Sequence, residues 1–153
     1  MKNKDDFSDL VLNVLSEIGL CSPDSVQLLL GTCAQESAFG KYRRQLGGGP
    51  ALGIFQMEPA TFMDIVENYL NYKPELKEKI LKVSGIDDLN NPEDLVFNDR
   101  LAICMARVHY LRVKEAIPSD LDGWARYWKK YYNTPKGKGT EYEFVCNYKR
   151  YCV

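Results

Sequence analysis

Apolar residues recur at helical spacing through most of this chain, and that periodicity constrains the fold more than any other feature. Several of the periodic segments open behind a proline, which suits the first turn of a helix because its missing N–H has no partner there. Gly19 and Gly85 follow two of them and can supply left-handed caps. No segment of useful length alternates apolar and polar residues as a half-buried strand does. The sequence therefore predicts a mainly α fold.

The strongest helix start is Asn91-Pro92-Glu93-Asp94. It combines a capping residue, a first-turn proline and two acids that face the positive end of the helix dipole. An apolar face continues from there up to Pro118. We therefore expect this helix to be the longest and the most central. Other helices are expected to follow Ser22-Pro23, Pro59, Pro74 and Leu121, with one more at each end of the chain.

Length and composition indicate one domain and exclude two kinds of partner. A chain of 153 residues with 45% hydrophobic content can bury one core, so we expect a single domain over residues 1–153. A net charge of −1 with interspersed acids and bases argues against nucleic acid. No segment approaches the ~20 apolar residues of a membrane span. The start Met1–Asp6 leads into an amphipathic helix, so we expect synthesis in the cytoplasm without a signal peptide and no stable membrane insertion.

The cysteines and the single histidine predict neither a metal nor a cofactor. The five cysteines are scattered without paired short spacing, which indicates reduced thiols, with Cys33 and Cys104 in the core. Cys146 and Cys152 could pair only in an oxidising compartment. His109 lies mid-helix, the sequence has no glycine-elbow serine, and we interpret this histidine as a structural or surface residue. No His, Cys and Asp cluster has metal-ligand spacing, so no metal is expected.

Glu36 is the strongest candidate for a catalytic acid. Leu29, Cys33 and Glu36 stand at i, i+4 and i+7 of the helix that follows Pro23, so the carboxyl group continues an apolar stripe. Burial there would penalise the anion and raise its pKa, as a general acid near neutral pH requires. The alternative is a solvent-facing glutamate in a last helical turn, or one that caps a neighbouring helix.

The segment 46–53 cannot be helical, because glycine is costly in a helix interior and Pro50 lacks a donor. A loop or short hairpin here would let the backbone approach a ligand closely and offer N–H and C=O groups to a sugar. A flexible linker is the alternative. The run Ile54-Phe55-Gln56-Met57 argues against a linker, because it should be packed.

Five aromatic residues crowd the segment 124–132. Flat rings of this kind can stack on sugars. At helical spacing, however, Trp124 and Trp128 are more typical of a core. Four basic residues near the expected cleft could contact carboxylates of a ligand, although a solvated surface role is the plainer interpretation: Arg43, Arg44, Lys136 and Lys138.

Three motifs, in this order, resemble those of the soluble lytic transglycosylases, which are relatives of goose-type lysozymes in the lysozyme-like superfamily. Glu36-Ser37-Ala38-Phe39 resembles the family's Glu-Ser motif, and Gly53-Ile54-Phe55-Gln56 resembles Gly-Leu-Met-Gln. The segment Tyr132–Gly137 matches Tyr-Asn-Ala-Gly-Pro-Gly at its first two and last positions. Glu36 and Gln56 stand slightly further apart than usual, which suggests a small insertion. The resemblance covers about residues 22–140.

The resemblance implies a lysozyme-like helical domain with a glycine-rich cleft loop. It also implies that peptidoglycan glycan strands are the partner and that the β-1,4 bond between N-acetylmuramic acid and N-acetylglucosamine is cleaved to a 1,6-anhydro product. Glu36 would act first as acid and then as base. The substrate-binding residues that it implies are Ser37, Gly53, Ile54, Phe55, Gln56 and Tyr132. No cofactor is implied.

Two alternatives stay open. A hydrolytic muramidase acting on the same bond needs a second carboxylate about 5 to 9 Å from the first, and Glu58 and Asp64 are nearest in sequence. A non-catalytic wall-binding virion component would keep the groove but has no use for a protonated acid. The resemblance is to phage-encoded members. It suggests an endolysin or a virion-associated enzyme that acts on the cell wall in the periplasm, the latter with other virion proteins as partners.

Overall fold

The computed structural model describes residues 3–134 and 136–153. Met1 and Lys2, which open the expected amino-terminal segment, and Pro135, the fourth position of the motif that begins at Tyr132, lie outside the described residues. Within the described ranges the protein is mainly helical, as predicted, and no strand forms there.

Seven α-helices, two short 3₁₀ helices and one π-helical turn account for the regular structure of the described residues. In chain order they are α1 (Lys4–Glu17), α2 (Pro23–Ser37), α3 (Pro59–Asn68), η1 (Leu70–Tyr72), α4 (Pro74–Ser84), η2 (Pro92–Val96), α5 (Asp99–Leu111), α6 (Leu121–Trp128), η3 (Lys129–Asn133, the π turn) and α7 (Glu141–Cys152).

The predicted helix starts at Pro23, Pro59 and Pro74 are confirmed. At the start of α2, the Ser22 hydroxyl accepts a hydrogen bond from Ser25 N at 3.1 Å, while Ser25 Oγ accepts one from Ser22 N at 2.9 Å. These reciprocal bonds satisfy two backbone donors that have no partner within the helix. They fix the start of α2 and so its direction, and Glu36 lies at the opposite end of this helix.

The helix predicted from Asn91 to Pro118 begins where expected, with Asn91 as cap, but is wrong in its continuity and in its end. The chain forms only the short η2, turns at the 79% exposed Phe97, and starts again as α5 at Asp99. Asn98 causes the break, because its side-chain oxygen accepts from Leu101 N at 3.0 Å and caps a new helix. α5 ends at Leu111, and α2, with 15 residues, is longer than α5, with 13.

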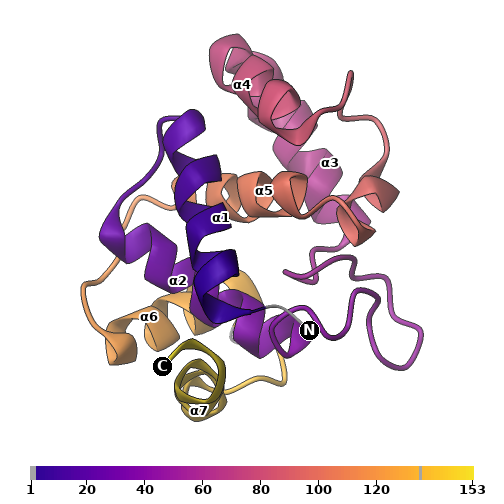
Figure 1. The fold of residues 1–153 in the computed structure, drawn as a ribbon. Helices are drawn as coiled ribbons and strands as arrows, with labels where there is room; N and C mark the ends of the chain where they lie inside the picture. The colour runs from indigo at the N-terminus through magenta and orange to yellow at the C-terminus, as the bar shows by residue number, and fades with distance from the viewer. Residues whose placement is uncertain (1–2, 135) are drawn as a thin grey trace.

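α5 is nevertheless central, as predicted. It contacts α1, α2, α3 and α4, and in Figure 1 it lies between α3 and α4 at one end of the molecule and α2, α6 and α7 at the other. Cys33 and Cys104 lie in the core, and none of the five cysteines forms a disulfide. Among the described helices, none has both the length and the apolar character needed to cross a bilayer.

The terminal helix α7 covers α2 and α6. The contact depends on Gly31, because a Cβ there would lie 2.3 Å from Cζ of Phe144. The Phe144 ring is fully buried and also packs on Trp128, with ring centroids 5.4 Å apart. α7 therefore supports the two helices that meet at Glu36.

Candidate active site

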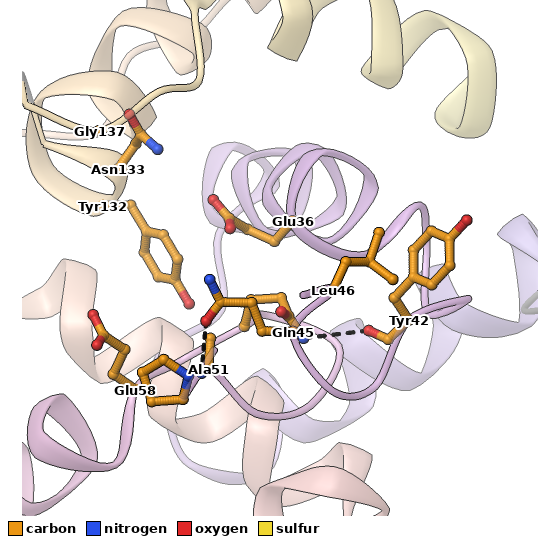
Figure 2. Close-up of a pocket in the computed structure, with 11 residues that line it drawn as sticks. Glu36, Tyr42, Gln45, Leu46, Ala51, Glu58, Tyr132, Asn133 and Gly137 are labelled. Atoms are coloured by element: carbon orange, nitrogen blue, oxygen red, sulfur yellow. Dashed lines mark hydrogen bonds between the residues drawn. The ribbon is translucent and has the colours of Figure 1, made fainter. Parts of the chain in front are cut away.

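A cleft of about 500 Å³ opens beside the carboxyl end of α2. It is bordered by α2, by the loop that joins α2 to α3 (residues 38–58, the cleft loop), and by η3 with the residues that follow it. Figure 2 shows Glu36, Tyr132 and Glu58 at different borders of this one cleft. The full lining is Glu36, Tyr42, Gln45, Leu46, Pro50, Ala51, Gln56, Glu58, Tyr132, Asn133 and Gly137.

The cleft loop is a compact hairpin-like excursion rather than a flexible linker. Leu52 and Met57 exchange backbone hydrogen bonds of 2.9 and 3.1 Å, and Gln45 N donates to Ala51 O at 3.1 Å. The run 54–57 is packed as expected, with Ile54 and Phe55 almost completely buried.

Gly53 is required where the cleft loop passes η2. Its φ is +78°, and a Cβ at this position would lie 2.3 Å from the carbonyl oxygen of Leu95. Both the backbone angle and the close approach exclude a side chain. The structure places Gly53, Ile54 and Phe55 beneath the cleft, where they support its wall, rather than among the lining residues.

Ser37 joins the end of α2 to the cleft loop. Its buried hydroxyl lies 2.6 Å from Ile54 O, to which it donates, and it accepts a hydrogen bond from Gly40 N at 2.8 Å. Ser37 is therefore next to Glu36 in the chain, but its side chain points into the protein and serves the backbone.

Gln56 lines the cleft and is held on one side only. Its Nε2 donates to Gly53 O at 2.9 Å and to Tyr42 O at 3.3 Å. No hydrogen bond from the described residues reaches its Oε1, so this oxygen is left to accept one from a ligand. Gln56 adopts a φ of +49°, which is uncommon for a residue with a side chain and is found where surrounding structure enforces it.

Glu36 has the surroundings of a general acid. Burial raises the pKa of its carboxyl group to about 7, and a hydrogen bond from Trp128 opposes part of that rise. Trp128 Nε1 donates to Glu36 Oε2 at 2.9 Å. An indole N–H can only donate, and the carbonyl oxygen of a neutral acid is a better acceptor than its hydroxyl oxygen, so this bond favours the proton on Oε1. The carboxyl group is thereby held by one oxygen and left free to donate through the other.

Trp128 is the residue of this site that sequence reasoning missed. It was expected to be a core residue, and its ring is indeed fully buried. Helical periodicity gives the inward direction of a side chain but not the identity of the polar group that its N–H meets. A signal was present, however, because a buried indole N–H needs an acceptor and Glu36 also lies on an inward face.

Tyr132 lies across the cleft from α2. Its hydroxyl donates to Phe55 O at 2.6 Å, which joins η3 to the cleft loop. Burial, followed by the negative charge of Glu36, raises the pKa of the Tyr132 phenol well above its usual value. The phenol therefore stays protonated and polar beside the acid. Asn133 also lines the cleft, and its Oδ1 accepts from Lys129 Nζ at 2.7 Å.

Only one of the two candidates for a second carboxylate lies in the cleft. Glu58 lines the cleft, whereas Asp64 lies elsewhere and pairs with Arg112 at 2.8 Å. Of the basic residues considered, Arg43 pairs with Asp99 at 2.7 Å and Arg44 pairs with Glu93. Neither arginine lines the cleft, and Lys136 and Lys138 do not either.

Within residues 3–134 and 136–153, no group of three or more His, Cys, Asp and Glu side chains could hold a metal ion. The groups that the cleft does offer are one carboxylic acid with a raised pKa, a second carboxylate, two phenols, amides and some apolar surface. Comparisons of the chain with protein-family models, with curated proteins and with solved structures find no match.

Proposed function

We propose that this protein is a lysozyme-like, peptidoglycan-cleaving lytic transglycosylase with Glu36 as its acid. The observation that carries the proposal is a carboxyl group with a pKa of about 7, fixed through one oxygen by Trp128, at the border of a cleft of about 500 Å³. An elongated polymer needs such an open cleft, and a glycosidic oxygen needs a proton donor of which a large fraction is still protonated near pH 7. The resemblance of the three motifs to the soluble lytic transglycosylases supports the substrate.

The reaction would use Glu36 twice. Oε1 gives its proton to the oxygen between N-acetylmuramic acid and N-acetylglucosamine, and the bond from the anomeric carbon to that oxygen breaks. The oxocarbenium-like centre is stabilised by the substrate's acetamido group. The Glu36 carboxylate then takes the proton of the muramyl C6 hydroxyl, and the C6 oxygen bonds to the anomeric carbon. The product is a 1,6-anhydro sugar, and no water is consumed.

Other lining residues would hold the sugars. Gln56 Oε1 can accept from a hydroxyl or an acetamido N–H, since its own amide nitrogen is already bonded to the loop. Leu46 is 67% exposed at the rim and offers an apolar surface to a sugar face. A bacteriophage endolysin or virion-borne enzyme acting on the wall is the setting that the resemblance favours.

Hydrolysis of the same bond is a second candidate, because Glu58 lines the cleft together with Glu36. In that reaction Glu58 would take a proton from a water molecule as the water oxygen attacks the anomeric carbon, while Glu36 protonates the leaving oxygen. The two candidate reactions share Glu36 as the acid and differ in the group that attacks the anomeric carbon, which is the C6 hydroxyl in one and water in the other. Their products differ by one water.

The test is digestion of purified peptidoglycan by the wild type, Glu36→Gln, Glu58→Gln and, as a control on α3, the exposed Glu67→Gln. We expect Glu36→Gln to lose about a hundredfold to ten-thousandfold in rate, since a general acid contributes about 10² to 10⁴. Glu67→Gln should match the wild type. Activity of Glu36→Gln equal to the wild type would overturn the proposal.

Mass spectrometry of the released ends distinguishes the two candidates. Anhydro-muramyl ends that persist in Glu58→Gln identify a transglycosylase. Ends one water heavier, lost in Glu58→Gln, identify a hydrolase and would replace the first candidate by the second.

A further inference from the structure

A small side pocket of about 70 Å³ lies beside the cleft and shares three of its lining residues, Gln56, Glu58 and Tyr132. Its remaining lining is Met57, Thr61 and His109. His109, the only histidine of the chain, therefore stands directly behind the cleft wall. None of the steps proposed above uses it.

His109 is bonded to the π turn that carries Tyr132. Its Nε2 lies 3.0 Å from the carbonyl oxygen of Tyr131. A carbonyl can only accept, so the imidazole must carry its proton on Nε2. The last carbonyls of a helix have no partner within it, and this bond from α5 supplies one where η3 ends. Single π turns occur often at functional sites, where the widened turn redirects side chains.

The ring of His109 also supports the ring of Tyr132. The two centroids are 4.9 Å apart at an interplanar angle of 76°, an edge-to-face contact. Tyr110 packs on the Tyr132 ring as well, at 5.4 Å. With the hydroxyl held by Phe55 O at 2.6 Å, the Tyr132 side chain is fixed at both its ends.

We infer that His109 is a positioning residue for the proposed cleavage: through the Tyr131 carbonyl and the Tyr132 ring it holds η3 so that Tyr132 and Asn133 border the cleft opposite Glu36. The inference rests on the proposed function for its effect on rate, whereas its geometric part stands without that function.

The charges around His109 agree with a neutral imidazole. Burial lowers its pKa and the Tyr131 carbonyl raises it, while Arg112, which follows the last residue of α5, lowers it and Asp64 on α3 raises it. Glu58 of the cleft loop, Thr61 of α3 and Tyr132 of η3 line the same side pocket, and the carbonyl oxygen of Tyr131 lies 3.0 Å from His109 Nε2. At neutral pH the ring is therefore an uncharged donor, suited to a fixed contact.

The kinetic test compares His109→Leu, which removes the donor, with His109→Gln, whose amide nitrogen can occupy the place of Nε2. Loss of one hydrogen bond and the ring contact is expected to lower kcat of His109→Leu about tenfold, with KM changed less than about twofold. His109→Gln should recover to within about threefold of the wild type. Both are assayed well below their unfolding temperatures. Wild-type kcat in His109→Leu, or equal impairment in both variants, would overturn the inference.

A second measurement separates this inference from the proposed function. Because the chain has a single histidine, its imidazole ¹⁵N signals need no assignment. We expect the Nε2–H tautomer and a protected Nε2 proton. The Nδ1–H tautomer, or an imidazole that titrates like a free one, would refute the positioning role even in a protein that cleaves peptidoglycan. If the wild type does not cleave peptidoglycan, these spectra alone test the geometric part of the inference. If His109→Leu does not fold, His109→Gln is compared with the wild type by itself.

Discussion

Within the cleft loop, the segment 45–57 has an outer half and an inner half that are held in different ways. The inner half, residues 51–57, is packed on the core and is bonded by the hydroxyls of Ser37 and Tyr132 to the carbonyls of Ile54 and Phe55. The outer half, residues 45–50, exposes most of Leu46, and a Cβ added at Gly47 or Gly48 would meet no atom within 4 Å.

The proposed reaction requires one rigid part of the site and one adaptable part, and this difference matches that requirement. The inner half and the helices below it hold the acid in one geometry, as proton transfer demands. The outer half can adjust to a polymer whose substituents vary along its length. The following predictions test that contrast, beginning with the largest effect.

Two glycines with the same backbone angle should respond differently to alanine. Gly53 and Gly48 have φ of +78° and +80°, but only at Gly53 would a Cβ meet backbone, at 2.3 Å from Leu95 O. Gly53→Ala should therefore cost about 3 kcal/mol of unfolding free energy, from backbone strain and overpacking together. Gly48→Ala should cost about 1 kcal/mol, from the angle alone. Urea denaturation measures both, and equal losses would show that the two halves are held alike.

Ser37→Ala tests the bond between α2 and the inner half. It leaves the Ile54 carbonyl and the Gly40 N–H without their partner in a buried place, so we expect a loss of about 2 kcal/mol. Exposed Ser16→Ala is the control and should change stability by less than about 0.5 kcal/mol. A loss for Ser37→Ala no larger than the control's would mean that the loop is anchored elsewhere.

Trp128→Phe removes the hydrogen bond to Glu36 Oε2. That bond favours the carboxylate, so the pKa of Glu36 should rise above about 7 and the alkaline limb of the pH–rate profile should move to higher pH. The rate on the acidic plateau should fall about tenfold, because the acid loses its fixed geometry. Trp124→Phe is the matched control: it also loses an indole bond, to Pro118 O at 2.6 Å, but lies away from the acid. An unchanged limb in Trp128→Phe would contradict this role.

The raised pKa of Glu36 should also appear in stability. Its value in the folded protein, about 7, lies above the ordinary 4.5, so folding favours the protonated form. That contribution is complete below pH 4.5 and is lost as pH rises through about 7. Glu36→Gln should therefore be more stable than the wild type at pH 9 by about 1 to 3 kcal/mol, since one unit of pKa is worth about 1.4 kcal/mol. Denaturation curves at pH 5 and pH 9 measure this, and parallel pH dependence in both proteins would show an ordinary surface acid.

The helix starts that could be predicted from the sequence are those that local capping chemistry decides. Ser22, Pro59 and Pro74 carry capping and first-turn signals that act within a few residues, and α2, α3 and α4 begin where those signals stand. The inward direction of Glu36 likewise follows from the spacing of its own helix. The sequence-based prediction failed at Asn98, where a second helix cap interrupts an apolar pattern that continues from Pro92.

Contacts between distant segments could not be predicted in this way. The partner of Trp128 Nε1 lies on α2, that of the Tyr132 hydroxyl lies in the cleft loop, and Glu58 reaches the cleft only because that loop folds back. Each depends on how helices pack, and a periodic pattern indicates an inward face without naming what it meets. Ser37 shows the same limit, since a residue expected to touch substrate instead holds the backbone.

The contact of Phe144 with Gly31 and Trp128 makes the surroundings of the acid depend on the terminal helix. A chain shortened before α7 would lose the ring that backs Trp128, the donor to Glu36 Oε2. Water would then reach Glu36 more easily, so its pKa should fall toward the ordinary 4.5.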